Sequence, residues 1–162
     1  MYEIVKFLGN RASNNTIGGM SASDKNIISG NVSAGIYLAN ARTSGNVMLG
    51  NFIGTNATGT TRVANQSNGI ALYSGASGNT IGGASASARN IISGNSHHGI
   101  SIEEASTTEN VVQGNYVGTD VSGAFAIRNG GYGIWMAGAC SNTIGGTAPG
   151  AESDPSGHGE GE

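Results

Sequence analysis

The densest group of polar side chains that could perform chemistry lies between residues 97 and 109. It contains the adjacent pair His97 and His98, then Glu103, Glu104 and Glu109. A histidine beside a carboxylate can act as a general base or as a weak metal ligand. His97, His98 and Glu103 are therefore the candidate catalytic residues. The competing interpretation, which we favour, is a solvated bend followed by a solvated loop. The spacing is not that of a metal centre, so no metal site is predicted.

A second candidate site is aromatic. Tyr37, Tyr73, Tyr132 and Trp135 all lie in or beside short segments in which Gly-Ile precedes a large aliphatic residue. Flat aromatic faces on a rigid sheet can hold sugar rings, while neighbouring Asn, Ser and His side chains supply hydrogen bonds. These four residues therefore form a predicted ligand-binding face for polysaccharide. In the alternative interpretation, they only stabilise the outer surface of a strand.

The segments that carry these residues repeat along the chain. The pattern Asn-x-x-x-Gly-Ile-x-aliphatic occurs four times, with its glycines 34, 30 and 34 positions apart, at residues 31–38, 65–72, 95–102 and 129–136. Two further motifs recur 63 or 64 residues apart: Asn-Thr-Ile-Gly-Gly at 15–19, 79–83 and 142–146, and Asn-Ile-Ile-Ser-Gly-Asn at 26–31 and 90–95. Near-fixed periods of this kind indicate stacked structural repeats, here with two turns in each 64-residue unit.

Each turn has room for three short strands, because β-branched residues alternate with Gly and Asn. The first strand is Gly-Ile-x-Leu, and the second begins near Asn15 and its equivalents. The third is the Ile-Ile-Ser type, for which residues 62–64 and 125–128 are the expected counterparts in the long turns. The sequence predicts an all-β fold, a single-stranded parallel β-helix or solenoid of about four to five turns over residues 14–149. Residues 1–13 are expected to form a capping strand or partial turn, and 150–162 a disordered acidic tail.

Stacking these turns in register makes two specific predictions. Ile36, Ile70, Ile100 and Ile134 should form an inward column, with neighbours about 4.8 Å apart. Equivalent asparagines should stack at the corners, bonded to one another through their amides and adopting the left-handed backbone that a sharp corner needs. They are Asn31, Asn65, Asn95 and Asn129.

Composition excludes several classes of function. The 162 residues include 29 glycines, only 10% charged residues and a net charge of −3, and they show no clustered basic stripe for nucleic acid. No apolar run is long enough to span a membrane, and no cofactor motif or secretion signal is visible.

The motifs Asn-Thr-Ile-Gly-Gly, Ala-Arg-Asn-Ile-Ile-Ser-Gly-Asn (88–95) and Gly-Asn-Tyr-Val-Gly-Thr-Asp (114–120) resemble right-handed parallel β-helix repeats of the pectate-lyase-like superfamily. They are most similar to Gly/Asn-rich arrays of large secreted or surface-attached bacterial proteins. The resemblance implies right-handedness and an extracellular or cell-surface location. Enzymes of that superfamily use Asp clusters, often with calcium or a nearby Arg or Lys. Here Asp24 and Asp120 occupy different repeat positions, which argues against such a cluster.

The sequence therefore favours a non-catalytic extracellular β-helix module that contacts carbohydrate and belongs to a larger protein. A polysaccharide lyase or epimerase is one alternative, with Asp120 as a further candidate beside the His–Glu cluster. A structural scaffold or adhesin stalk is the other, because open solenoid ends invite end-to-end or edge association.

Overall fold

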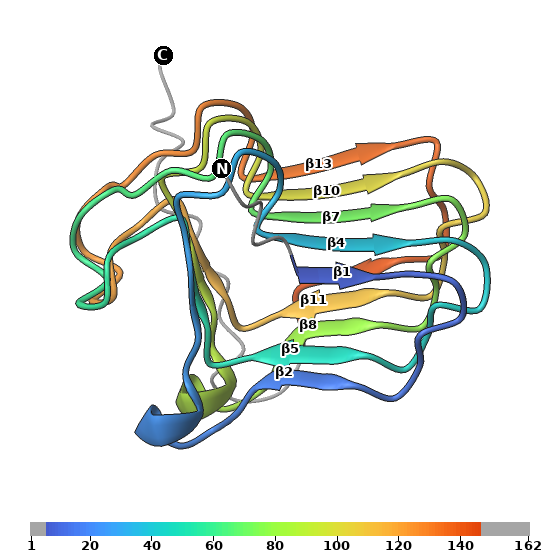
Figure 1. Cartoon of the computed structure of the whole chain (residues 1–162), viewed down its shortest axis with the longest axis horizontal. Helices are drawn as coiled ribbons and strands as arrows, with labels where there is room; N and C mark the ends of the chain where they lie inside the picture. Colours follow the sequence, from blue (N-terminus) through green and yellow to red (C-terminus); the bar gives the residue numbers. More distant parts are fainter. Residues whose placement is uncertain (1–5, 147–162) are drawn as a thin grey trace, which may run out of the picture.

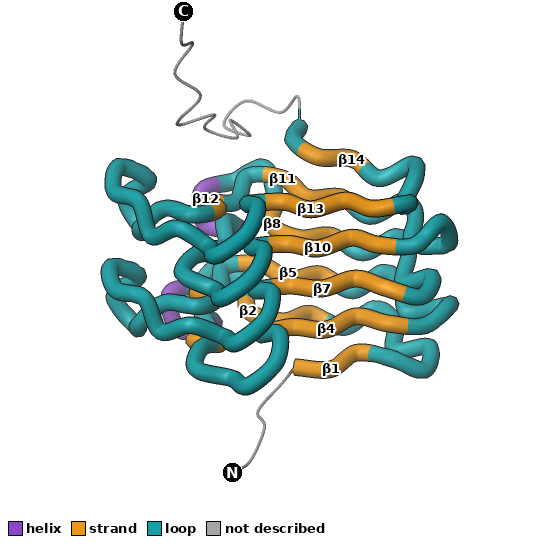
Figure 2. Tube along the Cα trace, turned by 90° about the horizontal axis from the view of Figure 1, so that it is seen from above, coloured by secondary structure: helices purple, strands orange, loops and turns teal. Residues whose placement is uncertain are grey.

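The computed structural model describes residues 6–146, and they form a parallel β-solenoid of about four turns (Figures 1 and 2). The described chain contains three parallel sheets, and its only helices are two single turns of 3-10 helix, η1 (Ala22–Asp24) and η2 (Ala86–Ala88). The predicted all-β solenoid, with three strands in a turn, is confirmed.

The three sheets run along the solenoid, and each takes one strand from successive turns. The first sheet contains β1 (Lys6–Leu8), β4 (Ile36–Ala39), β7 (Ile70–Tyr73), β10 (Ile100–Glu103) and β13 (Ile134–Ala137). The second contains β2 (Thr16–Gly18), β5 (Val47–Leu49), β8 (Thr80–Gly82), β11 (Val111–Gln113) and β14 (Thr143–Ile144). The third contains β3 (Ile27–Ile28), β6 (Phe52–Ile53), β9 (Ile91–Ile92) and β12 (Tyr116–Val117).

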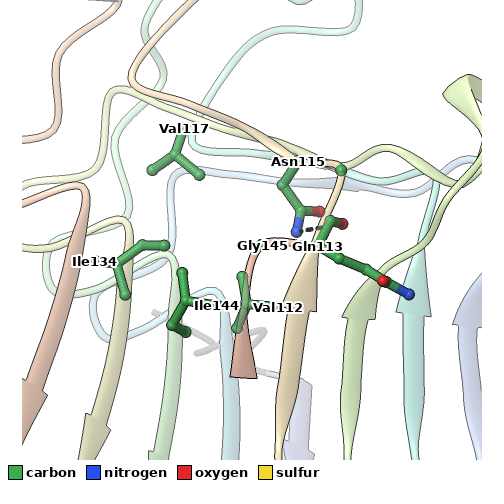
Figure 3. Close-up of a pocket in the computed structure, with 8 residues that line it drawn as sticks. Val112, Gln113, Asn115, Val117, Ile134, Ile144 and Gly145 are labelled. Atoms are coloured by element: carbon green, nitrogen blue, oxygen red, sulfur yellow. Dashed lines mark hydrogen bonds between the residues drawn. The ribbon is translucent and has the colours of Figure 1, made fainter. Parts of the chain in front are cut away.

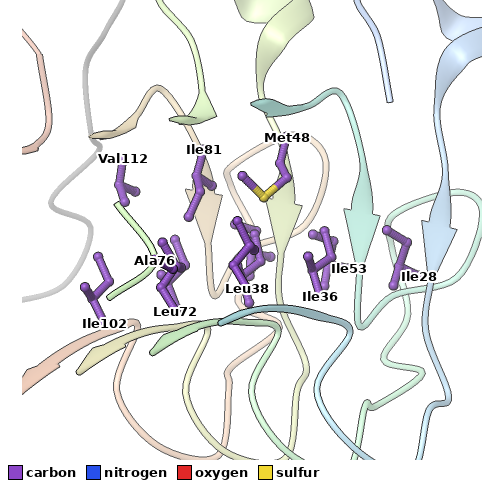
Figure 4. Packing of buried hydrophobic residues seen from close by; sticks show 13 residues of the cluster. Ile28, Ile36, Leu38, Met48, Ile53, Leu72, Ala76, Ile81, Ile102 and Val112 are labelled. Carbon is purple, nitrogen blue, oxygen red and sulfur yellow. The ribbon is translucent and has the colours of Figure 1, made fainter. Parts of the chain in front are cut away.

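The predicted isoleucine column is confirmed. Ile70 pairs in register with Ile36 on one side and Ile100 on the other, and Ile100 pairs with Ile134. Ile36, Ile70 and Ile100 are fully buried. The second and third sheets send their own aliphatic residues into the same narrow core (Figure 4), chiefly Met48, Ile81, Val112, Ile28, Ile53 and Ile92.

Asparagine ladders line the corners between the sheets. The predicted ladder is confirmed: the Asn65 amide oxygen accepts the Asn31 side-chain N–H at 2.7 Å and its backbone N–H at 3.1 Å. The same pattern repeats in two further ladders. One is Asn15, Asn46, Asn79, Asn110 and Asn142, and the other is Asn26, Asn51, Asn90 and Asn115. These bonds satisfy buried polar groups that would otherwise be costly.

The prediction that ladder asparagines adopt a left-handed backbone is wrong. None of them has a positive φ in the described chain; the residue just before often does, as at Gly30 (φ 75°), Gly45 (66°) and Gly94 (74°). Glycine adopts this conformation at little steric cost. The glycine makes the turn, so the following asparagine can direct its amide along the ladder.

The predicted third strands of the long turns are also wrong. Phe52–Ile53 and Tyr116–Val117 occupy those places, whereas residues 62–64 and 125–128 form no strand. The chain turns at Gly50 (φ 71°) so that Asn51 joins a ladder, and β6 follows immediately. The residues beyond β6 fold back on themselves as a projecting loop, closed by an antiparallel bridge between Thr55 and Arg62.

Lys6–Leu8 of the N-terminal segment form β1, in which Phe7 pairs with Tyr37 and Leu8 with Leu38. The predicted acidic tail, residues 150–162, lies outside the described residues. Within residues 6–146, no helix has the length and apolar character needed to cross a membrane.

Candidate functional site

The predicted ligand-binding residues lie on the outer face of the first sheet. Side chains alternate along each strand, so Ile36 and Leu38 face the core while Tyr37 faces outward. Strand register aligns Phe7, Tyr37, Ala71, Ser101 and Trp135 in one outward row across all five strands. The aromatic members of this face, with their neighbours at the preceding bends, form two separate stacks.

The N-terminal stack contains Phe7, Tyr37 and Tyr73. The ring centroids of Phe7 and Tyr37 are 5.7 Å apart, and those of Tyr37 and Tyr73 are 5.4 Å apart, with interplanar angles of 22° and 28°. Tyr73 is one row further along its strand than Tyr37, because its backbone pairs with Ala39. Its ring therefore leans back across the sheet to reach the stack.

The C-terminal stack contains His98, Tyr132 and Trp135. The imidazole of His98 lies 5.6 Å from the Tyr132 ring and 5.4 Å from the Trp135 ring, and the two larger rings are 5.1 Å apart. All three are nearly parallel, with interplanar angles between 12° and 24°. The structure thus divides the four predicted aromatic residues into two pairs and adds His98 to the second.

A polar bridge joins the two stacks. The Tyr73 hydroxyl lies 3.1 Å from Glu103 Oε1 and 3.3 Å from Ser101 Oγ, and it accepts a hydrogen bond from Asn68 Nδ2 at 3.2 Å. Ser101 also donates to Glu103 Oε1. Asn68 accepts the backbone N–H of His98 at 3.0 Å. These contacts connect one stack to the other through side chains of adjacent turns.

The phenol of Tyr73 is held in its neutral form by this environment. Partial burial is the main cause that raises its pKa above the usual 10.0, and the Glu103 carboxylate acts in the same direction, while the Ser101 hydrogen bond opposes it. A neutral phenol can donate a hydrogen bond to the Glu103 carboxylate, whereas a phenolate would repel that carboxylate.

In the His–Glu cluster that we considered for catalysis, His98 and Glu103 have different hydrogen-bond partners. His98 Nδ1 accepts the backbone N–H of Tyr132 at 2.9 Å, so that nitrogen is already used and the neutral ring carries its proton on Nε2. Glu103 bonds instead to Tyr73 and Ser101. The ring of His97 is exposed and lies edge-on to that of His98, 6.5 Å away. Among the described residues, no group of three His, Cys, Asp or Glu side chains is placed to hold a metal ion.

Asp120 has a local structural role. Its Oδ1 accepts hydrogen bonds from the Ser122 hydroxyl at 2.7 Å, the Ser122 backbone at 3.1 Å and the Phe125 backbone at 3.3 Å. These bonds, led by that of the Ser122 hydroxyl, lower the pKa of the carboxyl below its usual 3.8. Asn56 organises the equivalent loop in the preceding unit through Thr60 and Thr61. The side chain of Asp120 thus stabilises the loop in which it lies.

One apolar opening, of about 150 Å³, lies at the last described turn of the core (Figure 3). Val112, Val117, Ile134 and Ile144 line it, and Asn115 there donates to the Gln113 carbonyl. It is the continuation of the aliphatic core and carries no titratable group. The aromatic face is chemically much better equipped to bind a ligand.

No family model, curated protein or solved structure matches the chain. The parallel solenoid is therefore established by the structure itself.

Three residues of the face were not predicted as site residues. Phe7 lies outside the repeated motifs, so the repeat gave no reason to select it. Ser101 was recognisable only as an outward position, and Asn68 only as a bend residue. Asn68 and Ser101 contribute through the Tyr73 hydroxyl. The direction in which the Tyr73 side chain points across the sheet is not specified by strand alternation.

Proposed function

We propose that this protein is a non-catalytic β-helix module that binds a linear polysaccharide along the outer face of its first sheet. The observation that carries the proposal is the outward row of the five strands, which holds two separate stacks of aromatic rings joined by a polar bridge. Across four strand spacings the row extends for about 19 Å. It runs parallel to the solenoid axis, so a chain of sugars would lie along the molecule and across the strands.

The face combines the two features that sugar recognition requires. Phe7 of the N-terminal stack and Tyr132 of the C-terminal stack are 56% and 62% exposed and offer aromatic surface to the ligand. Tyr73 and Glu103 are half-buried, and the polar bridge between the stacks contains the hydroxyl of the first and the carboxylate of the second. The aromatic surface would cover the apolar faces of sugar rings, and the polar groups would bond to their hydroxyls. Inter-ring stacking also stiffens the face before binding, which lowers the entropic cost of association.

The resemblance to pectate-lyase-like repeats is consistent with the same assignment, because polysaccharide lyases and epimerases are among the proteins that contain such repeats. It also supports an extracellular or cell-surface site of action. A non-catalytic role agrees with the use of His98 Nδ1 by the backbone and of Asp120 by its own loop.

The test is a binding measurement with soluble linear glycans, such as hydroxyethyl cellulose, xylan, mannan and methyl-esterified pectin. We expect Trp135→Ala to weaken binding about tenfold, equivalent to about 1.4 kcal/mol. Phe125→Ala is the matched control, because Phe125 is 71% exposed on a projecting loop and belongs to neither stack.

Two outcomes would contradict the proposal. If no glycan binds and Trp135→Ala only lowers the melting temperature, the aromatic rings only stabilise the outer surface of the sheet. If incubation with glycans generates the absorbance of unsaturated products, and His98→Ala abolishes it, the protein is a lyase.

A further inference from the structure

Glu103 is the acidic side chain at the middle of the proposed binding face. It lies on β10, directly after the buried Ile102, and its backbone pairs with Ala137 on β13. Its neighbours in the polar bridge are the hydroxyls of Tyr73 and Ser101. Both hydroxyls stabilise the carboxylate by hydrogen bonding, but neither carries a positive charge that would neutralise it.

The next side chain along the chain, Glu104, adds a second negative charge close to this carboxylate. Glu104 directs its Oε2 to the backbone N–H of Ser74 at 3.1 Å, in the turn that follows β7. The arginines in the equivalent turns, Arg11 after β1 and Arg42 after β4, lie three and two strands away from β10 in the sheet. The centre of the face is consequently acidic.

We infer that the face selects polysaccharides without carboxylate groups and discriminates against polyuronates. This inference rests on the proposed function and specifies its ligand class. A glycan bound across both stacks must pass Glu103, because the carboxylate bonds to Tyr73 of one stack and its strand pairs with the strand of Trp135. A sugar hydroxyl at that point can donate a hydrogen bond to the Glu103 carboxylate. The carboxylate of a uronate at the same point would instead be repelled by Glu103.

The half-buried position of Glu103 strengthens this discrimination. Charges that are partly removed from water are screened less by solvent and salt than fully exposed ones. The aromatic rings on either side cannot compensate a negative ligand, because the face of an aromatic ring is itself the negative part of its quadrupole.

The experiment uses two pairs of glycans that share a backbone and differ in charge. They are methyl-esterified and de-esterified oligogalacturonate, and hydroxyethyl and carboxymethyl cellulose. At low ionic strength we expect the neutral member of a pair to bind about tenfold more tightly than the acidic member, with a smaller ratio at high salt.

The decisive variant is Glu103→Gln, which keeps a side-chain oxygen to accept from Tyr73 and Ser101 but removes the charge. We expect it to raise affinity for the acidic glycan severalfold relative to the neutral one, so that the ratio between the two falls toward one. Glu109→Gln is the control, since it makes the same change in net charge at an exposed loop residue beyond β10. It should leave the ratio unchanged.

The outcomes separate the two proposals. Equal binding of neutral and acidic partners by the unaltered protein, or no change of the ratio in Glu103→Gln, overturns the charge selection while leaving sugar binding in place. If Glu103→Gln and Glu109→Gln change the ratio equally, the preference for neutral glycans comes from the net charge of the protein. That result would also overturn the assignment of the selection to Glu103. Failure of every glycan to bind overturns the proposed function and this inference with it.

Discussion

The inward and outward rows of the first sheet belong to the same strands, yet they vary very differently. At one inward position the four repeats place isoleucine every time, and each isoleucine pairs with its equivalent in the neighbouring repeat. At the adjacent outward position the same strands carry Tyr37, Ala71, Ser101 and Trp135. In a solenoid the vertical neighbour of a core residue is its own counterpart, so size and shape must match. The outward row has no such constraint and can acquire specific chemistry.

The asparagine ladders belong with the inward row, and they should be the most sensitive part of the molecule. Asn79 is fully buried; its oxygen accepts two hydrogen bonds from Asn46, and its Nδ2 lies within hydrogen-bond distance of Asn110, Thr43 and Ser77. We expect Asn79→Ala to lower the free energy of unfolding by more than about 3 kcal/mol, because several buried groups lose their partners at once. Urea denaturation followed by circular dichroism measures this change.

Asn142→Ala tests the same ladder at its last described member, which is only half-buried. Its expected cost is about 1 kcal/mol. Equal losses at Asn79 and Asn142 would mean that burial within the stack does not set the value of these bonds, and the contrast between inward and outward rows would lose its physical basis.

The polar bridge is the part of the outward face that should contribute measurably to stability. We expect Tyr73→Phe to cost about 1 kcal/mol at neutral pH, because Asn68, Ser101 and Glu103 lose one shared partner. The folded-state pKa of Tyr73 is raised, so its contribution is complete below about pH 10 and is lost as the pH rises through the higher value. The variant should lack this alkaline loss.

The control for the bridge is Tyr132→Phe, since Tyr132 is an exposed ring of the other stack. Its alkaline stability should follow that of the unaltered protein. Unfolding free energies measured from neutral to alkaline pH compare the three proteins. An identical alkaline decline in Tyr73→Phe would refute the assignment.

The smallest expected effect lies on the projecting loops. The pKa of Asp120 is lowered in the folded state, chiefly by the Ser122 hydroxyl, so its contribution is present above about pH 4 and is lost as the pH falls through the lowered value. Asn56 shows that an amide can organise the same turn. We expect Asp120→Asn to leave stability at neutral pH nearly unchanged and to reduce its decline in acid. A large loss at neutral pH would show that this carboxylate does more than organise its loop.

How far the sequence predicts each region follows from the same contrast. The isoleucine column and the ladder from Asn31 to Asn129 were predictable, because equivalent positions recur at a near-fixed spacing and stacking brings them together. The third strand of the long turns was missed although Gly-Asn-Phe-Ile-Gly-Thr at 50–55 recurs as Gly-Asn-Tyr-Val-Gly-Thr at 114–119. The recurrence marks the repeat, but it does not show that a single turn at Gly50 separates β5 from a new strand, β6.

By itself, the sequence determined the repeat, the parallel solenoid and the identity of the residues that face outward. Period and alternation are local properties of the chain, and stacking converts them directly into structure. Only the tertiary structure decided that the aromatic residues form two stacks, that His98 joins one of them, and that Glu103 bonds to Tyr73 rather than to a histidine. These contacts depend on how side chains lean across neighbouring turns, and that lean is set by packing among residues about 30 positions apart.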